Sequence, residues 1–154
     1  MSRCTECGGE LEKKTTTERR KVAGQTFTAE LPAEGCKACS ETYVDASALE
    51  AYELAIARAL ATSGANSGEA FRFQRKALGL RASDLAELLG VAAETMSRWE
   101  TGQREVNRGA LVTLGSLVLD RCEGRATTLD RLRTLRQAPR LAKVVTLHVA
   151  SSAR

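Results

Sequence analysis

The sequence predicts an α+β protein: a small β domain with one covering helix, a hinge, and an all-α bundle that contains a helix-turn-helix. Three observations support this fold class. Two cysteine pairs flank a β-type stretch, small and polar residues follow an amphipathic helix, and several short helical stretches then end at glycines. The expected parts are 1–62 for the β domain, 63–68 for the hinge, 69–138 for the bundle and 139–154 for a tail.

The charge is unevenly distributed along the 154 residues. Residues 1–64 hold 8 Lys and Arg against 10 Asp and Glu, whereas residues 65–154 hold 15 against 9, so the halves carry −2 and +6. This asymmetry favours a polyanion partner for the second half, although a solvated basic surface is an equally good explanation of charge alone. The chain lacks a long apolar run and its first residues are already charged, so we expect a cytoplasmic protein without a membrane function.

The first domain is polar. Residues 10–35 contain short β-type segments rich in threonine, at 15–17 and 26–28, and we expect breaks at Gly24 and Pro32. These segments are too polar to fold around a core of their own.

One amphipathic helix should cover this small sheet. We expect it to begin at Ser47, because Ser47 to Glu50 fits a capping box. Its apolar residues recur at helical spacing, at Leu49, Tyr52, Ile56, Ala59 and Leu60.

The strongest chemical signal is a pair of Cys-x-x-Cys motifs. Cys4 and Cys7 form the first, Cys36 and Cys39 form the second, and 28 residues separate them. Four thiolates from two such turns form the tetrahedral shell of a structural Zn²⁺ site, whose binding energy supports domains with little core. Disulfides are disfavoured in the cytoplasm, a thioredoxin-like dithiol would need a βαβ context, and an iron–sulfur cluster remains an alternative. We therefore expect one structural zinc ion per chain and no metal catalysis, since four protein ligands leave no open position.

Two other potential ligands stand apart from these motifs. Cys122 is expected to be a small buried apolar residue and His148 an ordinary tail residue.

The helices of the bundle are marked by their glycine ends. Three short helices end at Gly79, Gly90 and Gly102, and two more cover 108–120 and 126–137. Beyond Pro139, an alternating pattern gives a weak strand signal at Val145, Leu147 and Val149, for which a frayed tail is the default.

Residues 75–104 carry the pattern of a helix-turn-helix and resemble domains of the Xre or phage-repressor type. Gly90 permits the tight turn, Val91 is a hydrophobic plug under the helix that follows it, and Met96 and Trp99 face inward. The opposite face would enter the major groove, where Arg98 pairs with guanine and Glu94 accepts a hydrogen bond from cytosine. The candidate DNA-binding residues are Ala93, Glu94, Thr95, Ser97, Arg98, Gln103, Arg104 and Arg81.

The resemblance to Xre-type domains has further implications. Arg75 and Glu100 match positions that usually hold an internal, structural Arg–carboxylate pair. The chain departs from the pattern at Arg81-Ala82, where Ser/Thr-Gln is usual, and at Ala92, where a capping Ser or Asn is usual, so DNA affinity is expected to be modest. A bundle that binds protein is the alternative.

The ordered combination of zinc motifs, short helix, hinge and Xre-type domain resembles the YgiT/MqsA family of antitoxins over about residues 1–120. The resemblance implies a bacterial, cytoplasmic, non-enzymatic repressor of a type II toxin–antitoxin pair. Its zinc domain would hold a small basic ribonuclease toxin of the RelE-like class, and its second domain would bind a palindromic operator as a homodimer. Glu94 stands where the family's best-known member has Asn, so the operator should differ.

Two other functions compete with this interpretation. One is a stand-alone zinc-containing Xre-family regulator without a toxin partner, and the other is a thiol-redox or metalloenzyme that uses the cysteines. An adjacent gene for a small ribonuclease-like protein would favour the antitoxin.

Overall fold

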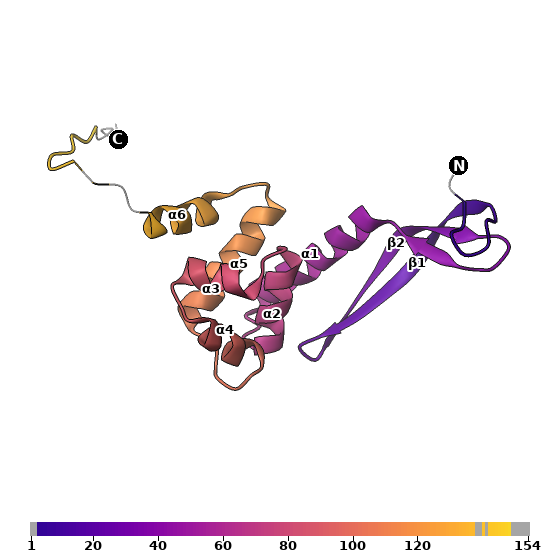
Figure 1. Cartoon of the computed structure of the whole chain (residues 1–154), viewed down its shortest axis with the longest axis horizontal. Helices are drawn as coiled ribbons and strands as arrows, with labels where there is room; N and C mark the ends of the chain where they lie inside the picture. The colour runs from indigo at the N-terminus through magenta and orange to yellow at the C-terminus, as the bar shows by residue number, and fades with distance from the viewer. Residues whose placement is uncertain (1–2, 138–139, 141, 149–154) are drawn as a thin grey trace, which may run out of the picture.

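A computed structural model describes residues 3–137, 140 and 142–148. A three-stranded antiparallel sheet, ordered β1-β2-β3, precedes the helices and extends away from them (Figure 1). The strands are β1 (Leu11–Val22), β2 (Gln25–Cys36) and β3 (Thr42–Val44), and the helices are α1 (Ala46–Ser63), α2 (Gly68–Ala77), α3 (Ala82–Leu89), α4 (Ala93–Glu100), α5 (Arg108–Cys122) and α6 (Thr127–Arg136). The predicted fold class, a small β part followed by an all-α part, is confirmed.

The first two strands are longer than expected. β1 and β2 have 12 residues each and pair along their whole length. The expected break at Gly24 is confirmed, whereas the prediction of short segments with a second break at Pro32 was wrong. Only Ala23 and Gly24 lie between them, both with positive φ, 50° and 79°. A two-residue turn with positive φ at both positions matches the twist of the paired strands, so Ala23 and Gly24 form the turn that connects β1 to β2.

Pro32 lies inside β2, where a break was expected. It pairs with Thr15 of β1, and its carbonyl accepts a hydrogen bond from the Asp45 backbone N–H at 3.0 Å. The nitrogen and carbonyl of one strand residue point to the same side, so the missing N–H of Pro32 faces β3. The proline therefore costs no bond to β1, and it costs none to β3 because β3 ends at Val44.

Helix α1 begins at Ala46, one residue earlier than predicted, and its N-cap is Asp45. The Asp45 carboxylate accepts hydrogen bonds from the Ala48 backbone N–H at 2.9 Å and from the Ser47 hydroxyl. A carboxylate outcompetes a hydroxyl for this position because it carries full charge at the positive end of the helix. The side chain of Ser47 therefore supports the cap instead of forming it.

The buried face of α1 joins the sheet to the helical body. Tyr52, Ile56 and Leu60 are buried with Leu31 of the sheet, and the Tyr52 hydroxyl donates to the Phe27 carbonyl at 2.8 Å. α1 also packs against α2 and α5, so it does more than cover the sheet, and Ala59, expected on the apolar stripe, is exposed.

The segment predicted as a hinge forms a capped turn between two helices. Gly64 ends α1 in the left-handed conformation, and the Ser67 side chain begins α2 by accepting from the Ala70 backbone N–H at 3.1 Å. Ala65 packs against the Ile56–Leu60 cluster. The division into two domains at 63–68 stays a prediction, and these contacts show how α1 and α2 are held together at that point.

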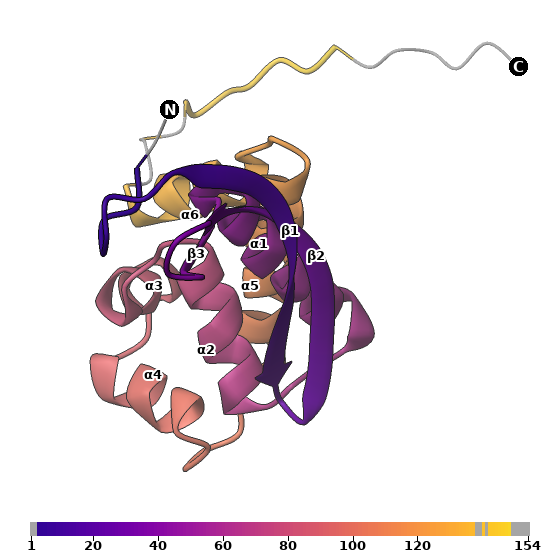
Figure 2. The same ribbon diagram turned by 90° about the vertical axis from the view of Figure 1, so that its right-hand side faces the viewer.

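The tip of the β1–β2 hairpin lies against α1 and α2 (Figure 2). Val22 is buried beside Ala70, and Arg20 forms an ion pair with Glu53 while its guanidinium lies 5.9 Å from the Phe73 ring centroid. The sheet is therefore anchored to the helices at its tip, while its cysteine-bearing end lies at the far end of the molecule (Figure 1).

The helical body has its own core. Phe71 and Trp99 pack edge to face, and their ring centroids are 5.9 Å apart. Other fully buried members of this core are Leu85, Met96 and Leu114. Cys122, at the end of α5, is half-buried. No helix among the described residues is long and apolar enough to cross a membrane.

A carboxylate of α5 holds the last helix. Asp120 is nearly buried, and its Oδ2 accepts a hydrogen bond from the Thr128 backbone N–H at 2.8 Å, in the first turn of α6. Ala126, which precedes α6, provides no side-chain cap, so Asp120 supplies the missing acceptor.

We expect Asp120→Ala to loosen α6 while the body stays folded, at a cost of about 1–2 kcal/mol. Hydrogen bonds from the Thr128 backbone and then its side chain lower the pKa of Asp120. The stabilisation is therefore complete above the ordinary carboxyl pKa and is lost as the pH falls through the lowered value. Amide hydrogen exchange across residues 127–136 measures the effect. Asp130→Ala, an exposed site on α6, is the control and should change exchange far less.

The part of the tail that the structure describes has no strand, so it matches the default of a frayed tail and not the weak strand signal. The described residues 142–148 are exposed and have no regular secondary structure, and His148 is among them. Pro139 and Val149 lie outside the described residues.

Candidate metal centre and nucleic-acid interface

The two cysteine pairs meet at the end of the sheet. The loop before β1 carries Cys4 and Cys7. Cys36 is the last residue of β2, and Cys39 lies in the connection from β2 to β3. All four Sγ atoms lie within 4.8 Å of one another. The Cys4–Cys39 and Cys7–Cys36 Sγ distances are both 3.5 Å.

These distances fit a tetrahedral metal site. A metal bonded to four sulfurs at about 2.3 Å places the sulfurs about 3.8 Å apart. The backbone of both pairs is already turned for ligation, because the Gly9 and Ala38 N–H groups each donate to a cysteine sulfur at 3.4 Å. Such hydrogen bonds stabilise thiolates and fix their direction. The cluster is consistent with a structural metal ion. Four protein ligands fill a tetrahedral shell, so no coordination position is left for water or a substrate.

Gly9 is required where the two loops approach each other. A Cβ atom on Gly9 would lie 2.9 Å from the Cys36 sulfur and 3.0 Å from the Ala38 side chain. Any other residue would push the two cysteine pairs apart.

A tyrosine touches the cluster, which sequence reasoning missed. The Tyr43 hydroxyl lies 3.2 Å from the Cys4 sulfur and 3.0 Å from the Thr5 hydroxyl. This contact lowers the pKa of Cys4 to about 6. Tyr43 follows the second pair by four residues, and no spacing rule in a single sequence marks it as a neighbour of the first pair.

The four thiols cannot all ionise by themselves. A backbone hydrogen bond at Glu41 lowers the pKa of Cys39, but the neighbouring sulfurs of Cys7 and Cys4 outweigh it and raise the value to about 12. Crowded thiolates repel each other, so a cation at their centre is what permits all four to carry charge. The donor set and its spacing therefore suit a cation that prefers sulfur.

Helices α3 and α4, joined by a short turn, occupy the segment predicted as a helix-turn-helix. Gly90 ends α3 in the left-handed conformation, and α4 starts three residues later. Met96 and Trp99 are buried, as the inward face requires. The outward face holds Ala93, Glu94, Ser97 and Arg98, all exposed, and Thr95 is half-buried. Gln103 and Arg104 follow in the exposed loop after α4.

Two of the candidate DNA-binding arginines, Arg98 in α4 and Arg81 at the start of α3, have acidic partners nearby in the chain. Arg98 pairs with Glu94 one turn earlier, and both side chains are more than half exposed. Arg81 forms two hydrogen bonds with Asp84, at 2.9 and 3.0 Å. Exposed pairs contribute only about 0.3–0.5 kcal/mol, so a phosphate or base could replace either carboxylate at small cost. The i,i+4 spacing of Glu94 and Arg98 was the available signal for this contact.

Arg75 and Glu100 join the first helix of the body to α4. The Arg75 Nη2 donates to Glu100 Oε2 at 2.9 Å, its Nε donates to the other carboxylate oxygen, and its Nη1 donates to the Leu80 carbonyl at 2.7 Å. Both side chains are less than 10% exposed. The pair fixes the angle between α2 and α4, and neither residue is available to DNA.

The model of the family described as "Antitoxin component of bacterial toxin-antitoxin system, MqsA" matches residues 2–125. The chain belongs to the MqsA antitoxin family. The match covers the cysteine cluster, the sheet and helices α1 to α5, whereas α6 and the tail lie beyond it. No curated protein and no solved structure gives a significant match. Membership supports an antitoxin role and indicates a non-enzymatic regulator.

Proposed function

We propose that this chain is the antitoxin and autorepressor of a type II toxin–antitoxin pair. Its cysteine-bearing part binds and neutralises a small basic ribonuclease toxin of the RelE-like class, and its helix-turn-helix binds a palindromic operator as a homodimer in the bacterial cytoplasm. One observation carries the proposal: a single antitoxin family model spans both the cysteine cluster and the helix-turn-helix.

The metal in this proposal is Zn²⁺, held by Cys4, Cys7, Cys36 and Cys39. Zinc prefers four thiolates in a closed tetrahedral shell, and it supplies folding energy to the end of a sheet that has few buried apolar side chains. The zinc ion would fix the two loops against each other. Toxin binding by this part is supported by its net charge of −2 over residues 1–64, which suits a basic partner.

The nucleic-acid interface in this proposal is the outward face of α4. Arg98 reads a guanine through two hydrogen bonds, and Glu94 either accepts from a cytosine or orients the arginine through their ion pair. Arg81, Gln103 and Arg104 lie at the edges of this face and would meet phosphates, while Ala93, Thr95 and Ser97 form its surface. A homodimer presents two such helices, which explains the expected palindrome.

For the DNA interface, we expect Arg98→Ala to weaken operator binding by about 1–3 kcal/mol while the domain stays folded. Electrophoretic mobility shifts with promoter DNA of the chain's own operon measure this loss. The matched control is Arg58→Ala, an exposed arginine on α1, which should bind like the unchanged protein. Equal affinity of the Arg98→Ala and unchanged proteins would reject the assignment of Arg98 as a base-reading residue.

The antitoxin part is tested by capture of partners from the protein's own cell extract with the zinc-loaded chain. A stoichiometric, small, basic ribonuclease-like protein is the expected result, and Arg98→Ala should retain it. Capture of DNA with no such protein would support a stand-alone zinc-containing regulator instead.

A further inference from the structure

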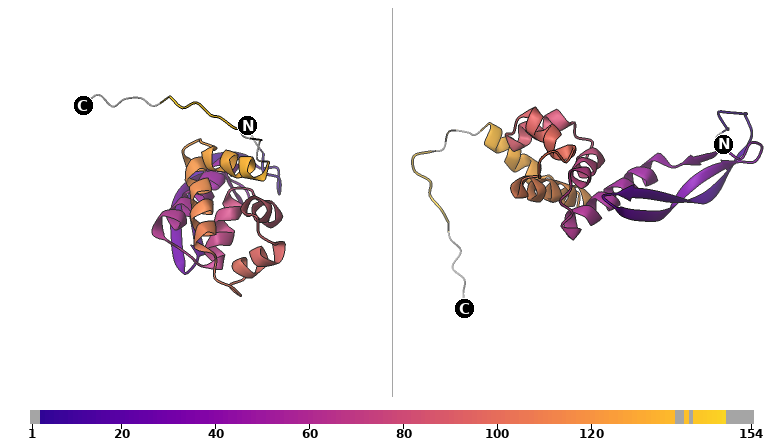
Figure 3. Two further views of the ribbon diagram at one scale, coloured as in Figure 1. Left: turned by 90° about the vertical axis from the view of Figure 1, so that its left-hand side faces the viewer. Right: turned by 90° about the horizontal axis from the view of Figure 1, so that it is seen from below.

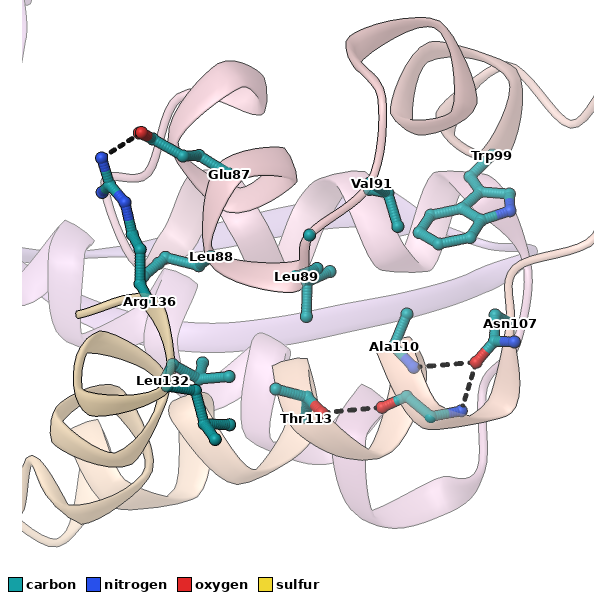
Figure 4. Close-up of a pocket in the computed structure, with 13 residues that line it drawn as sticks. Glu87, Leu88, Leu89, Val91, Trp99, Asn107, Ala110, Thr113, Leu132 and Arg136 are labelled. Atoms are coloured by element: carbon teal, nitrogen blue, oxygen red, sulfur yellow. Dashed lines mark hydrogen bonds and ion pairs between the residues drawn. The ribbon is translucent and has the colours of Figure 1, made fainter. Parts of the chain in front are cut away.

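An apolar groove opens between the helix-turn-helix and the last helix. It encloses about 660 Å³. Leu88, Leu89 and Val91 line one side, and Leu132 and Leu135 of α6 line another. Figure 4 shows Leu89, Val91 and Leu132 facing this space, with Ala110 and Thr113 of α5 along its floor. We call it the α3–α6 groove.

The groove is open to solvent in this single chain. Leu135 lines the groove and is 78% exposed. Burial of this leucine against a partner would be favourable, because it would remove apolar surface from water. The ion pair between Arg136 and Glu87 closes one end (Figure 4). A volume of this size holds several aliphatic side chains, so the groove can accept a short apolar segment.

The tail of the chain offers such a segment. Val144, Val145 and Leu147 are 83%, 64% and 77% exposed, and with Leu135 they are four of the five most exposed large apolar side chains of the described residues. The fifth is Val112 on α5, which does not line the groove. In an extended chain, Val145 and Leu147 point to the same side, so they can enter a groove together.

The path of the tail decides between its own groove and that of another molecule. Residues 142–148 lie away from the helical body and outside the groove of their own chain (Figures 1 and 3). α6 is itself a wall of the groove, so these residues could reach their own groove only if the chain folded back along the helix that precedes them. A second copy related by two-fold symmetry would receive the tail without this reversal and would give its own tail in return.

We propose that the α3–α6 groove binds residues 142–148 of a second copy, so that two chains exchange tails. The inference rests on the homodimer of the proposed function and names its interface. α6 and the tail lie beyond the family match, which ends at residue 125. The cysteine cluster and the outward face of α4 take no part in it.

The test is the oligomeric state of the full, metal-loaded chain by analytical ultracentrifugation across a concentration series. We expect Leu147→Asp in the tail and Leu135→Asp in the groove each to raise the dimer dissociation constant at least tenfold. Both side chains are exposed within one chain, so neither change should alter its folding, which circular dichroism checks. Val112→Asp is the matched control, since it places the same charge at an exposed apolar site outside the groove, and it should leave the dissociation constant unchanged.

A mixing experiment separates exchange from docking within one chain. In a mixed dimer, the Leu147→Asp copy keeps an intact groove and the Leu135→Asp copy keeps an intact tail, so one contact survives. We therefore expect a 1:1 mixture to form heterodimers more tightly than either variant forms homodimers. No gain on mixing would overturn the exchange.

The remaining outcomes distinguish this inference from the proposed function. If the dimer persists in both leucine variants but dissociates in Val112→Asp, the groove is not the interface. The homodimer of the proposed function would still stand, with a different interface. An unchanged protein that stays monomeric at all concentrations, with and without operator DNA, would overturn both this inference and the homodimer of the proposed function.

Discussion

Replacing Cys36 by Ser should abolish metal binding and unfold the cysteine-bearing end of the sheet. Cys36 is buried at the end of β2, and its sulfur lies 3.5 Å from that of Cys7. A serine hydroxyl is a poor ligand for a metal that prefers sulfur, and metal ligation of this kind is worth about 10–16 kcal/mol. No other interaction that the structure describes at this end of the sheet approaches that magnitude, so residues 3–10 and 36–43 should lose their structure.

The helices should survive this change. The hairpin tip and α1 are held to the body by Val22, Tyr52 and Ile56, which lie far from the cysteines along the sheet. We therefore expect metal content to fall from one ion per chain to none, the helical circular dichroism signal to remain mostly intact, and toxin capture to be lost while DNA binding persists.

The matched control for this prediction is Cys122→Ser. Cys122 is the fifth cysteine, half-buried on α5 and outside the cluster, so its replacement should leave the metal in place. Metal analysis of the purified variants, together with far-ultraviolet circular dichroism, gives the answer. Full metal content in Cys36→Ser would contradict a four-cysteine site, and collapse of all helicity would show that the sheet and the body fold as one unit.

Arg75→Ala should destabilise the helical body by about 3–5 kcal/mol. The substitution leaves the Glu100 carboxylate buried without its cation and leaves the Leu80 carbonyl without its donor. An uncompensated buried charge is costly because the interior cannot replace its lost hydration. Urea unfolding, followed by tryptophan fluorescence of Trp99, measures the loss.

Two further variants test this explanation. Arg72→Ala, an exposed arginine on the same helix, should change the free energy of unfolding by less than about 0.5 kcal/mol. The double variant Arg75→Leu with Glu100→Met removes both charges and should recover much of the stability, because a buried pair is often no better than apolar contacts. A double variant as unstable as Arg75→Ala would show that the hydrogen bonds to Leu80 and α4, and not the lone charge, account for the effect.

The helical part could be predicted from the sequence almost element by element. Its signals are local: Gly90 and Gly102 end helices, and Met96 and Trp99 recur at the spacing that one buried face requires. The β part was predicted less well, because the sequence of residues 10–35 is polar and strand pairing depends on partners distant in the chain. Pro32 illustrates the difference, since its tolerance within β2 depends on where β3 ends.

The candidate sites divide in the same way. The cysteine spacing predicted the cluster, because two Cys-x-x-Cys turns need little else to hold a metal. The Tyr43 contact with Cys4 and the groove beside α6 had no signal in the sequence. The ion pair of Glu94 with Arg98 did have a signal in the sequence, because the two residues are four apart on one helix. The proposed base-reading arginine therefore has an acidic partner in the absence of DNA.

The sequence by itself determined the four-cysteine cluster, the succession of short helices and the order of the elements, because each depends on residues within one turn or one motif. Only the tertiary structure decided how the parts are joined. The predicted hinge is a capped turn, α1 packs against α2 and α5, and the hairpin tip rests on the helices. These contacts join residues that are far apart in the chain. They form because a small polar sheet buries little apolar surface by itself and buries more when it shares a core with the helices.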